Sequence, residues 1–416
     1  MNKLSLLIII LFLVNNCSTS EKNGLFNKEK TKVNETENAK VILTKKSRIE
    51  QEFNPTLKIQ FSSEELSKNS NNNQNNIGEL SYQGNLKKIG KYNFSKLDDF
   101  EYIDIQPAFF NDHVVLYDNK GTIILYDQNQ KAIWKKNFYT KSEKKLKPRL
   151  NFASQKKILI VTDNIAKYYA VNIETGEIIW SKKNIVPFYS DIKIKDDIFY
   201  AVDYKNILRS IAIKDGSEIW NLKTEDSLMK SNTKLSVAIK NKNIYFNNSI
   251  GDITSVDINT GQLVWQLPTQ NINISKNAFQ LSNSKLVINE NSILFSNNKS
   301  DFYSIDLITG LINWKNEINS DLRPIVIGKF LVTISNKGYL YIVDKRTGNI
   351  IRINDLFNNF KFKKRKEMTV TNFFVARNKI YVFNNNGRLI TVELNSGNII
   401  DINKILGNNL LQPHVN

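Results

Sequence analysis

The chain has little of the chemistry on which most enzyme and metal sites depend. Its 416 residues include one cysteine, Cys17, and two histidines, His113 and His414. A lone cysteine excludes an intramolecular disulfide, and no Cys and His residues stand at metal-binding spacing. The sequence also lacks a Gly-x-Ser-x-Gly elbow and a glycine-rich phosphate loop. We therefore expect no catalytic residue, no metal and no cofactor, and a chain that is not an enzyme.

The apolar run at the N-terminus is too short to cross a bilayer. It covers Leu4–Val14, interrupted by Ser5, whereas a membrane-spanning helix needs about 20 residues. With Lys3 before it, the run is typical of a secretory signal over residues 1–16. Cys17 follows directly and resembles the acylated cysteine of a bacterial lipobox, although Asn16 stands where that motif prefers a small residue. We expect lipidation at Cys17; the alternative is an ordinary secreted protein.

Negative charge is also scarce. Against 58 Lys and Arg residues there are 40 Asp and Glu residues, a formal net charge of +18. Such a surplus suits nucleic acid, anionic lipid or acidic proteins, but the lysines are scattered and the export signal argues against nucleic acid. Residues 141–147 and 360–366 are more strongly basic, and the second segment interleaves Phe360 and Phe362 with its charges. Each is either a solvated loop or a contact for anionic headgroups or an acidic partner.

What the sequence does contain is a repeat that accounts for all five tryptophans. Ala170–Trp180 is its clearest copy, in which a Thr-Gly pair precedes the tryptophan. The tryptophan position is occupied, in chain order, by Trp134, Trp180, Trp220, Trp265, Trp314, Arg352 and Asp401. Subtracting neighbouring positions gives spacings of 38–49 residues. A period in the forties made of short strands predicts an all-β fold, a β-propeller with one four-stranded sheet per repeat.

The repeated glycine and tryptophan have structural explanations. The turn between the third and fourth strands needs a residue that tolerates positive φ, and the first copy replaces Thr-Gly with Asn129-Gln130, in which Asn is the more tolerant residue. The glycines expected at these turns are Gly176, Gly216, Gly261, Gly310, Gly348 and Gly397. We expect each tryptophan to pack as a wedge against the neighbouring sheet, with its N–H bonded to a backbone acceptor.

The remaining chain is organised around this propeller, which we place at residues 86–416. Residues 17–85 are mostly polar and include an Asn-rich stretch, so they predict a largely disordered tether, in which Leu57–Phe61 could dock locally. Residues 89–94 match 133–138, and Gly90 aligns with Trp134, so the N-terminal segment supplies a closing outer strand. Seven full repeats plus this strand predict an eight-bladed propeller. Residues 411–416 echo the start of the first repeat, so the last blade is either truncated or depleted.

The Thr-Gly-x-x-x-Trp phrase resembles the repeats of eight-bladed quinoprotein-like propellers with PQQ-like repeats. One branch comprises the pyrroloquinoline-quinone alcohol dehydrogenases, and another comprises BamB, lipoproteins of the bacterial outer-membrane β-barrel assembly machine. The single cysteine rules out the vicinal cysteine pair of the dehydrogenases. The Cys17 signal, the polar tether and the N-terminal closing strand resemble the BamB branch. This resemblance implies a lipid-anchored scaffold on the periplasmic face of the outer membrane, monomeric within a larger complex that contains a BamA-like protein.

The resemblance also implies where the partner binds. The main contact loop of the family corresponds to residues 224–232, where Leu228, Met229 and Lys230 loosely reproduce aliphatic residues followed by a basic one. A second contact, acidic in the family, falls near Asn283 and Lys285, which are not acidic here. Two alternatives stay open: a quinone-cofactor or other small-molecule enzyme that uses the central channel, or a periplasmic propeller that binds an unrelated protein or a glycan.

Overall fold

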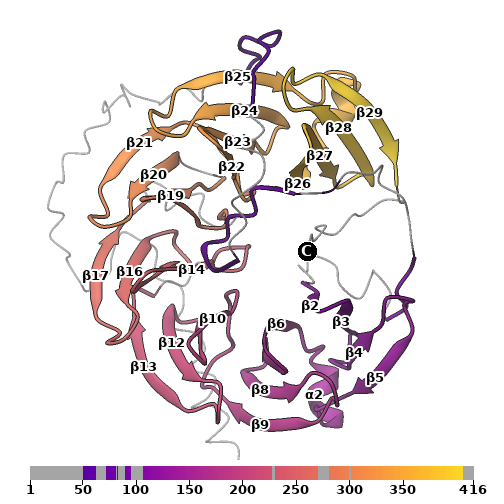
Figure 1. The fold of residues 1–416 in the computed structure, drawn as a ribbon, viewed down its shortest axis with the longest axis vertical. Helices are drawn as coiled ribbons and strands as arrows, with labels where there is room; N and C mark the ends of the chain where they lie inside the picture. Colours follow the sequence, from indigo (N-terminus) through magenta and orange to yellow (C-terminus); the bar gives the residue numbers. More distant parts are fainter. Residues whose placement is uncertain are drawn as a thin grey trace, which may run out of the picture. The chain divides into compact units, whose positions relative to one another are not determined.

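The computed structural model describes residues 50–61, 72–80, 82, 90–94, 106–226, 230–269, 281–298 and 301–405. Within this part of the chain the strands form seven antiparallel sheets, each with four strands from one repeat (Figure 1). The strands of the first four sheets are β2 (Ala108–Phe110), β3 (His113–Tyr117), β4 (Ile123–Tyr126), β5 (Ala132–Lys136), β6 (Leu150–Gln155), β7 (Ile158–Asp163), β8 (Lys167–Asn172), β9 (Ile178–Lys183), β10 (Lys193–Lys195), β11 (Ile198–Val202), β12 (Ile207–Ala212), β13 (Glu218–Lys223), β14 (Val237–Lys240), β15 (Asn243–Asn247), β16 (Ile253–Asp257) and β17 (Leu263–Leu267).

Three further sheets continue the ring, and the seventh gains a short fifth strand from the N-terminal segment. Two short helices lie in loops between sheets, and a 3-10 turn lies near the N-terminus. These elements are β18 (Val287–Asn289), β19 (Ser292–Phe295), β20 (Phe302–Asp306), β21 (Ile312–Asn316), β22 (Ile325–Ile327), β23 (Phe330–Ile334), β24 (Tyr339–Asp344), β25 (Ile350–Asp355), β26 (Val370–Ala376), β27 (Lys379–Asn384), β28 (Arg388–Glu393), β29 (Ile399–Lys404), β1 (Glu79–Leu80), α2 (Lys141–Lys145), α3 (Phe362–Arg365) and η1 (Asn72–Gln74). None of the helices described is long and apolar enough to span a membrane.

Sheet 4 shows how the repeat specifies its strands. Nearly every side chain of β15 and β16 is buried, because both faces pack against neighbouring sheets, whereas the outermost strand β17 is mostly exposed. The turn before β17 closes at Gly261, whose φ is 72°. Asp257 accepts the backbone N–H groups of Asn259 and Thr260 at 3.0 and 2.9 Å. These bonds, that from Thr260 above all, lower the pKa of Asp257, so turn capping accounts for its carboxylate.

The five tryptophans lie between consecutive sheets. Each indole N–H donates to a backbone carbonyl of the next sheet, for example Trp180 to Ile213 at 2.7 Å and Trp314 to Lys345 at 2.9 Å. Each ring also covers the turn glycine of that next sheet, so closely that a Cβ added at Gly216 would collide with Trp180. Six apolar clusters among the described residues likewise combine side chains from pairs of consecutive sheets.

The first repeat departs from the expected turn chemistry. Gln130, and not Asn129, adopts the positive φ, at 60°. A Cβ added at Gly90 would collide with the Gln130 side chain, so the glutamine fills the space that a tryptophan would fill at Gly90. Tyr92 packs edge-on against Tyr126 with ring centroids 5.1 Å apart, and the Tyr126 hydroxyl donates to Asn93 at 2.8 Å. Residues 90–94 therefore flank sheet 1 where an eighth blade's outer strand belongs.

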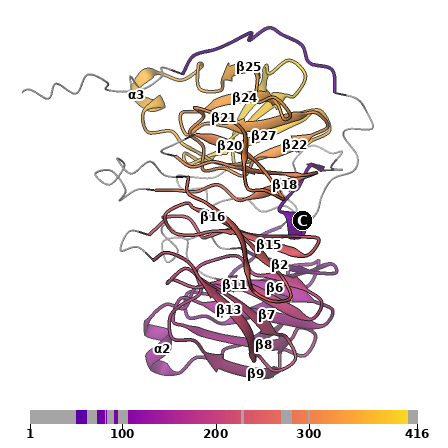
Figure 2. The same ribbon diagram turned by 90° about the vertical axis from the view of Figure 1, so that its left-hand side faces the viewer.

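Part of the segment expected to be a disordered tether is bound to the propeller. Residues 50–61, which we call the strap, cross the outside of sheets 6 and 7, and Phe53 forms a β-bridge with Ile353 (Figure 2). Ile59 is buried, and its N–H donates to Asn395 at 2.9 Å. The signal at residues 1–16 and residues 17–49 of the predicted tether, Cys17 among them, lie outside the described residues.

The Asn-rich stretch also departs from the expectation. Its residues 72–76 lie inside the ring, where η1 contacts β14 and β18 (Figure 1). The Asn75 amide donates to Val237 at 3.0 Å and to Leu286 at 2.9 Å. Composition predicted disorder here because asparagine buries little apolar surface. Hydrogen bonding of its amides to the carbonyls of inner strands supplies the missing partners.

Candidate functional site

The sheet topology gives the ring two faces that carry different kinds of loop. Strands within a sheet alternate in direction, so all loops that join an outer strand to the next inner strand lie on one face, which we call the connection face. The Thr-Gly turns between third and fourth strands lie on the opposite, Thr-Gly face. Figure 2 shows α2 and α3, both in connections between sheets, projecting on the same side. Loops on a rigid scaffold are the usual carriers of binding residues.

The loop expected to bind a partner, residues 224–232, lies on the connection face between sheets 3 and 4. Leu228 and Met229 lie outside the described residues. Lys230 is held by the loop itself: its ammonium pairs with Asp226 at 2.5 Å and lies 5.1 Å from the centre of the Tyr204 ring. Asp226 and Tyr204 therefore fix the position of its ammonium group.

Asn283 and Lys285, near which the family resemblance places a second contact, are both bonded within the propeller. Asn283 is 3% exposed, and its backbone N–H and carbonyl both bond to the Thr233 hydroxyl, at 2.8 and 3.0 Å. Lys285 forms an ion pair with Asp191, from the loop before β10. Both residues are thus committed to contacts between sheets near the ring's axis. Whether they also contact a partner stays a prediction.

Around Lys285 the axis carries a buried charge cluster. Burial raises the pKa of Asp191, but the ammonium groups of Lys285, Lys193 and Lys234 outweigh it and hold that pKa below its ordinary value. Burial lowers the pKa of Lys193 to about 7, although Asp191 opposes this effect. The Lys193 ammonium also donates to the Asn72 carbonyl at 2.5 Å. The cluster therefore binds the chain's own η1 segment on the inside of the ring.

At the axis, Asp191 faces the ammonium groups of Lys193, Lys234 and Lys285, and the Arg323 guanidinium also acts on Lys193. Among the described residues, no group of three or more His, Cys, Asp and Glu side chains could hold a metal ion. His113 lies on β3, while His414 falls outside the described residues.

The sequence did not predict the structural role of Arg352. It occupies the tryptophan position of sheet 6, and its guanidinium donates to Leu394 at 2.8 Å, the carbonyl equivalent to those that the indoles reach. It also donates to Asn395 and, at 2.8 Å, to Leu57 of the strap. The side chain is fully buried, and burial lowers its pKa to about 10. A charged residue at a position that tryptophan holds in the first five repeats was the available signal that another segment binds there.

Comparisons with known proteins agree with this architecture. A curated relative, the outer membrane protein assembly factor BamB of Yersinia pestis, is 21% identical over 253 residues, which are 59% of this chain and 62% of the relative. The chain thus matches less than two thirds of that relative's length. The crystal structure of BamB from Moraxella catarrhalis superposes with a TM-score of 0.61 and 16% identity, covering 73% of this chain and 89% of that one.

A europium-containing methanol dehydrogenase has a TM-score of 0.58, 10% identity, and coverage of 73% of this chain and 78% of its own. At such identities the structural likenesses establish the shared propeller fold alone. The family is decided by sequence: the model described as outer membrane protein assembly factor BamB matches residues 119–354, more than half of the chain and most of sheets 1 to 6. The chain therefore belongs to the BamB family.

Proposed function

We propose that this chain is a non-enzymatic scaffold lipoprotein of outer-membrane β-barrel assembly, which binds the periplasmic domains of a BamA-like partner. The observation that carries the proposal is the family match across the sheets that present loop 224–232. In this role the ring supplies a rigid body, and its loops hold the partner's domains while another subunit handles the substrate chain. Acylation at Cys17 keeps the protein on the periplasmic face of the outer membrane.

The contacts around loop 224–232 support its part in binding. The Asn206 amide donates to Glu225 at 2.8 Å, and the Thr224 hydroxyl donates to Asn206 at 3.0 Å, so the first half of the loop is fixed to sheet 3. Lys230 is fixed at the other end by Asp226. Apolar residues held on a rigid support are suitable anchors, because a few such residues usually dominate an interface. Lys230 beside them contributes orientation and specificity more than affinity.

The experiment is capture of the partner's periplasmic domains by the folded protein. Changing Leu228 and Met229 together to Ser should weaken binding by about 2 kcal/mol or more, with little change in Tm because the substitution is confined to a loop. The matched control is Ile308→Ser with Leu311→Ser, an exposed apolar pair on the Thr-Gly face. Unchanged capture by the first variant would reject this loop and favour a different protein or a glycan as the ligand.

The alternative function, an enzyme that uses the central channel, receives less support. Residues 72–76 of the chain itself lie against the inner strands of sheets 3, 4 and 5, through Lys193, Val237 and Leu286. A small-molecule substrate or a quinone would have to displace them there. Saturating quinone that left the thermal unfolding of the protein unchanged would argue further against this alternative.

A further inference from the structure

Three connections carry an exposed apolar side chain among basic residues. Leu146 follows α2 between sheets 1 and 2, Ile185 lies between sheets 2 and 3, and Phe362 begins α3 between sheets 6 and 7; they are 61%, 87% and 70% exposed. All three belong to the connection face. The lysines next to them in sequence are Lys144, Lys145, Lys147, Lys182, Lys183, Lys361, Lys363, Lys364 and Lys366. Apolar tips and positive charge therefore coincide on one face.

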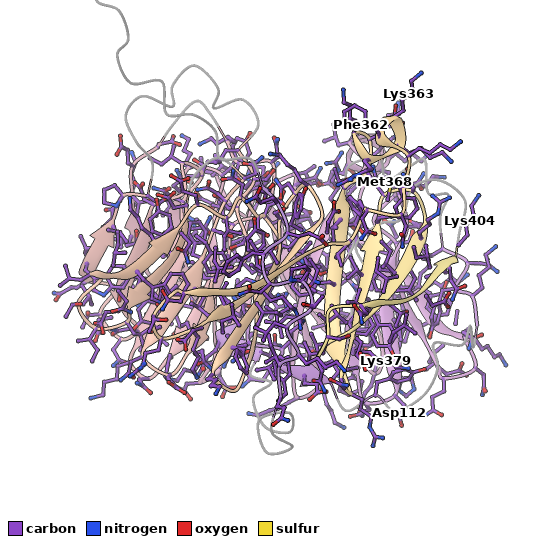
Figure 3. The ribbon with its side chains drawn as sticks, turned by 90° about the horizontal axis from the view of Figure 1, so that it is seen from above. Asp112, Phe362, Lys363, Met368, Lys379 and Lys404 are labelled. Atoms are coloured by element: carbon purple, nitrogen blue, oxygen red, sulfur yellow. The ribbon has the colours of Figure 1, made fainter. Side chains whose placement is uncertain are left out.

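The Thr-Gly face provides the contrast. Ile308 and Leu311, in the turn of sheet 5, are each 69% exposed, but the residues between and before them are Thr309, Gly310 and Asp306. At this turn the exposed apolar residues have no lysine beside them, whereas in the three connections they do. Figure 3 shows Phe362 and Lys363 at one end of the ring axis, and Asp112 and Lys379 at the other.

In the loop around α3, some side chains are bound to the propeller and others are exposed. Phe360 packs against Phe357, with ring centroids 6.2 Å apart, and the Arg365 guanidinium pairs with Asp355. These two contacts fix the loop to sheet 6. Phe362 is exposed, and the Lys366 ammonium lies 4.7 Å from its ring centre. Lys361, Lys363, Lys364 and Lys366 are exposed, with Glu367 as the one exposed carboxylate in this segment.

The strap begins on the same face. Glu50 accepts the Tyr341 hydroxyl at 2.9 Å and lies 3.6 Å from Lys337, in the hairpin between β23 and β24. Glu52 accepts the backbone N–H of Asp355 at 3.1 Å, and Asp355 in turn holds Arg365 of α3. The chain that leads back to Cys17 therefore leaves the propeller next to α3, on the connection face.

We propose that the connection face binds the surface of an anionic lipid bilayer, with Leu146, Ile185 and Phe362 entering the interface and their neighbouring lysines contacting the headgroups. The inference depends on the proposed function in one respect, the location of the protein at a membrane. Amphipathic contacts of this kind combine buried apolar area with attraction to anionic lipid. Each lysine near such a surface contributes roughly a fivefold gain in partitioning.

Each tip alone binds weakly, but the three lie on one rigid body and act together. Residues 18–49 join the propeller to Cys17. An acylated Cys17 would hold the propeller at high effective concentration beside the bilayer. A face with spread tips and lysines fits an extended planar charge better than a single acidic peptide, which would engage one loop.

The test measures binding of the chain from Ser18 to Asn416, made without acyl groups, to vesicles. These contain either phosphatidylcholine alone or phosphatidylcholine with about a third phosphatidylglycerol. We expect binding to the anionic vesicles that weakens with salt. The combined change Lys363→Gln and Lys364→Gln should lower the partition coefficient by roughly 10- to 30-fold, and Phe362→Ser should lower it separately.

The matched control is Lys242→Gln with Lys379→Gln, the same loss of charge in hairpin turns on the Thr-Gly side. If the control and α3 variants lost the same amount of vesicle binding, net charge alone would explain the effect and the proposal would be overturned. Equal binding of the wild type to both kinds of vesicle would also overturn it. Capture of the BamA-like partner by the α3 variant is measured in parallel. If the α3 variant lost partner capture but kept its vesicle binding, α3 would belong to a protein interface instead. If every variant and the wild type failed to capture the partner, only the proposed function would be contradicted.

Discussion

At the scale of single residues, tryptophan and arginine both join consecutive sheets from the same position of the repeat, but they do so with different chemical groups. Trp134, Trp180 and their equivalents use one N–H and a flat ring to join consecutive sheets. Arg352 uses a guanidinium with several donors, reaching the same carbonyl position in the next sheet and the strap as well. An arginine is suited to this because its planar fork can serve several acceptors at once.

Replacing one of the tryptophans should therefore be costly. Trp265→Ala removes packing on Gly310 and Tyr245 and the bond to the Leu307 carbonyl at 3.3 Å. We expect the free energy of unfolding in denaturant titrations to fall by about 3–5 kcal/mol. Leu263→Ala, on the same strand but exposed, is the control. A loss below about 1 kcal/mol in the Trp265 variant would show that the indole is not a wedge.

The buried Lys193 makes a pH-dependent contribution to stability. Its pKa is about 7 in the fold and about 10.4 in an unfolded chain. Between these values the unfolded state binds one more proton, so stability rises as pH rises; below pH 7 both states are protonated and the slope from this group ends. We expect wild type to gain about 2 kcal/mol relative to Lys193→Met between pH 7 and 9. Parallel pH profiles, measured against Lys242→Met as control, would contradict this.

At the scale of elements, the strap behaves as an added layer on sheets 6 and 7, and Arg352 is the residue that joins it. Arg352→Met removes donors to the carbonyls of Leu57, Leu394 and Asn395. We expect hydrogen exchange at the Phe53 and Ile59 amides to speed up by about tenfold or more, since bonds to charged donors are individually strong.

Arg346→Met, in the exposed turn of the same sheet, should leave those two amides protected. If the Arg352 variant exchanged at the wild-type rate, the strap would be held by its β-bridge to Ile353 and its other bonds without the guanidinium.

The elements also show which parts of the structure the sequence could predict. The propeller followed from a period and a turn motif, because each repeat buries itself against the next by the same local pattern. The match of residues 89–94 to 133–138 predicted that residues 90–94 lie beside sheet 1, although these residues form no strand there. The docking of Asn75 did not, since its partners are carbonyls of Val237 and Leu286, far away in the sequence and without any side-chain signature. Likewise the ion pair of Lys285 with Asp191 was not predicted, because nothing in the local sequence of either residue indicates the other.

At the scale of the whole molecule, the proposed anchor and the proposed membrane face act on one protein. Cys17→Ala should release most of the protein from isolated membranes, because acyl chains contribute about 0.8 kcal/mol per buried CH₂. Fractionation of membranes in high salt is the measurement, since salt weakens the lysine contacts of the connection face at the same time. A Cys17→Ala chain that still sedimented quantitatively with membranes in high salt would rule out lipid anchoring at this residue.

The strap has a consequence for the order of events when the protein is made. Its bonds to Arg352, Asn354 and Asp355 join residues about 300 positions apart: 295, 299 and 303. At a synthesis rate of roughly 5–20 residues per second, the strap is made about 15–60 s before the strands that receive it. Through that interval residues 50–61 have no sheet to bind. The strap is therefore among the last parts of the molecule to settle, and its docking marks a propeller whose sixth and seventh sheets are already in place.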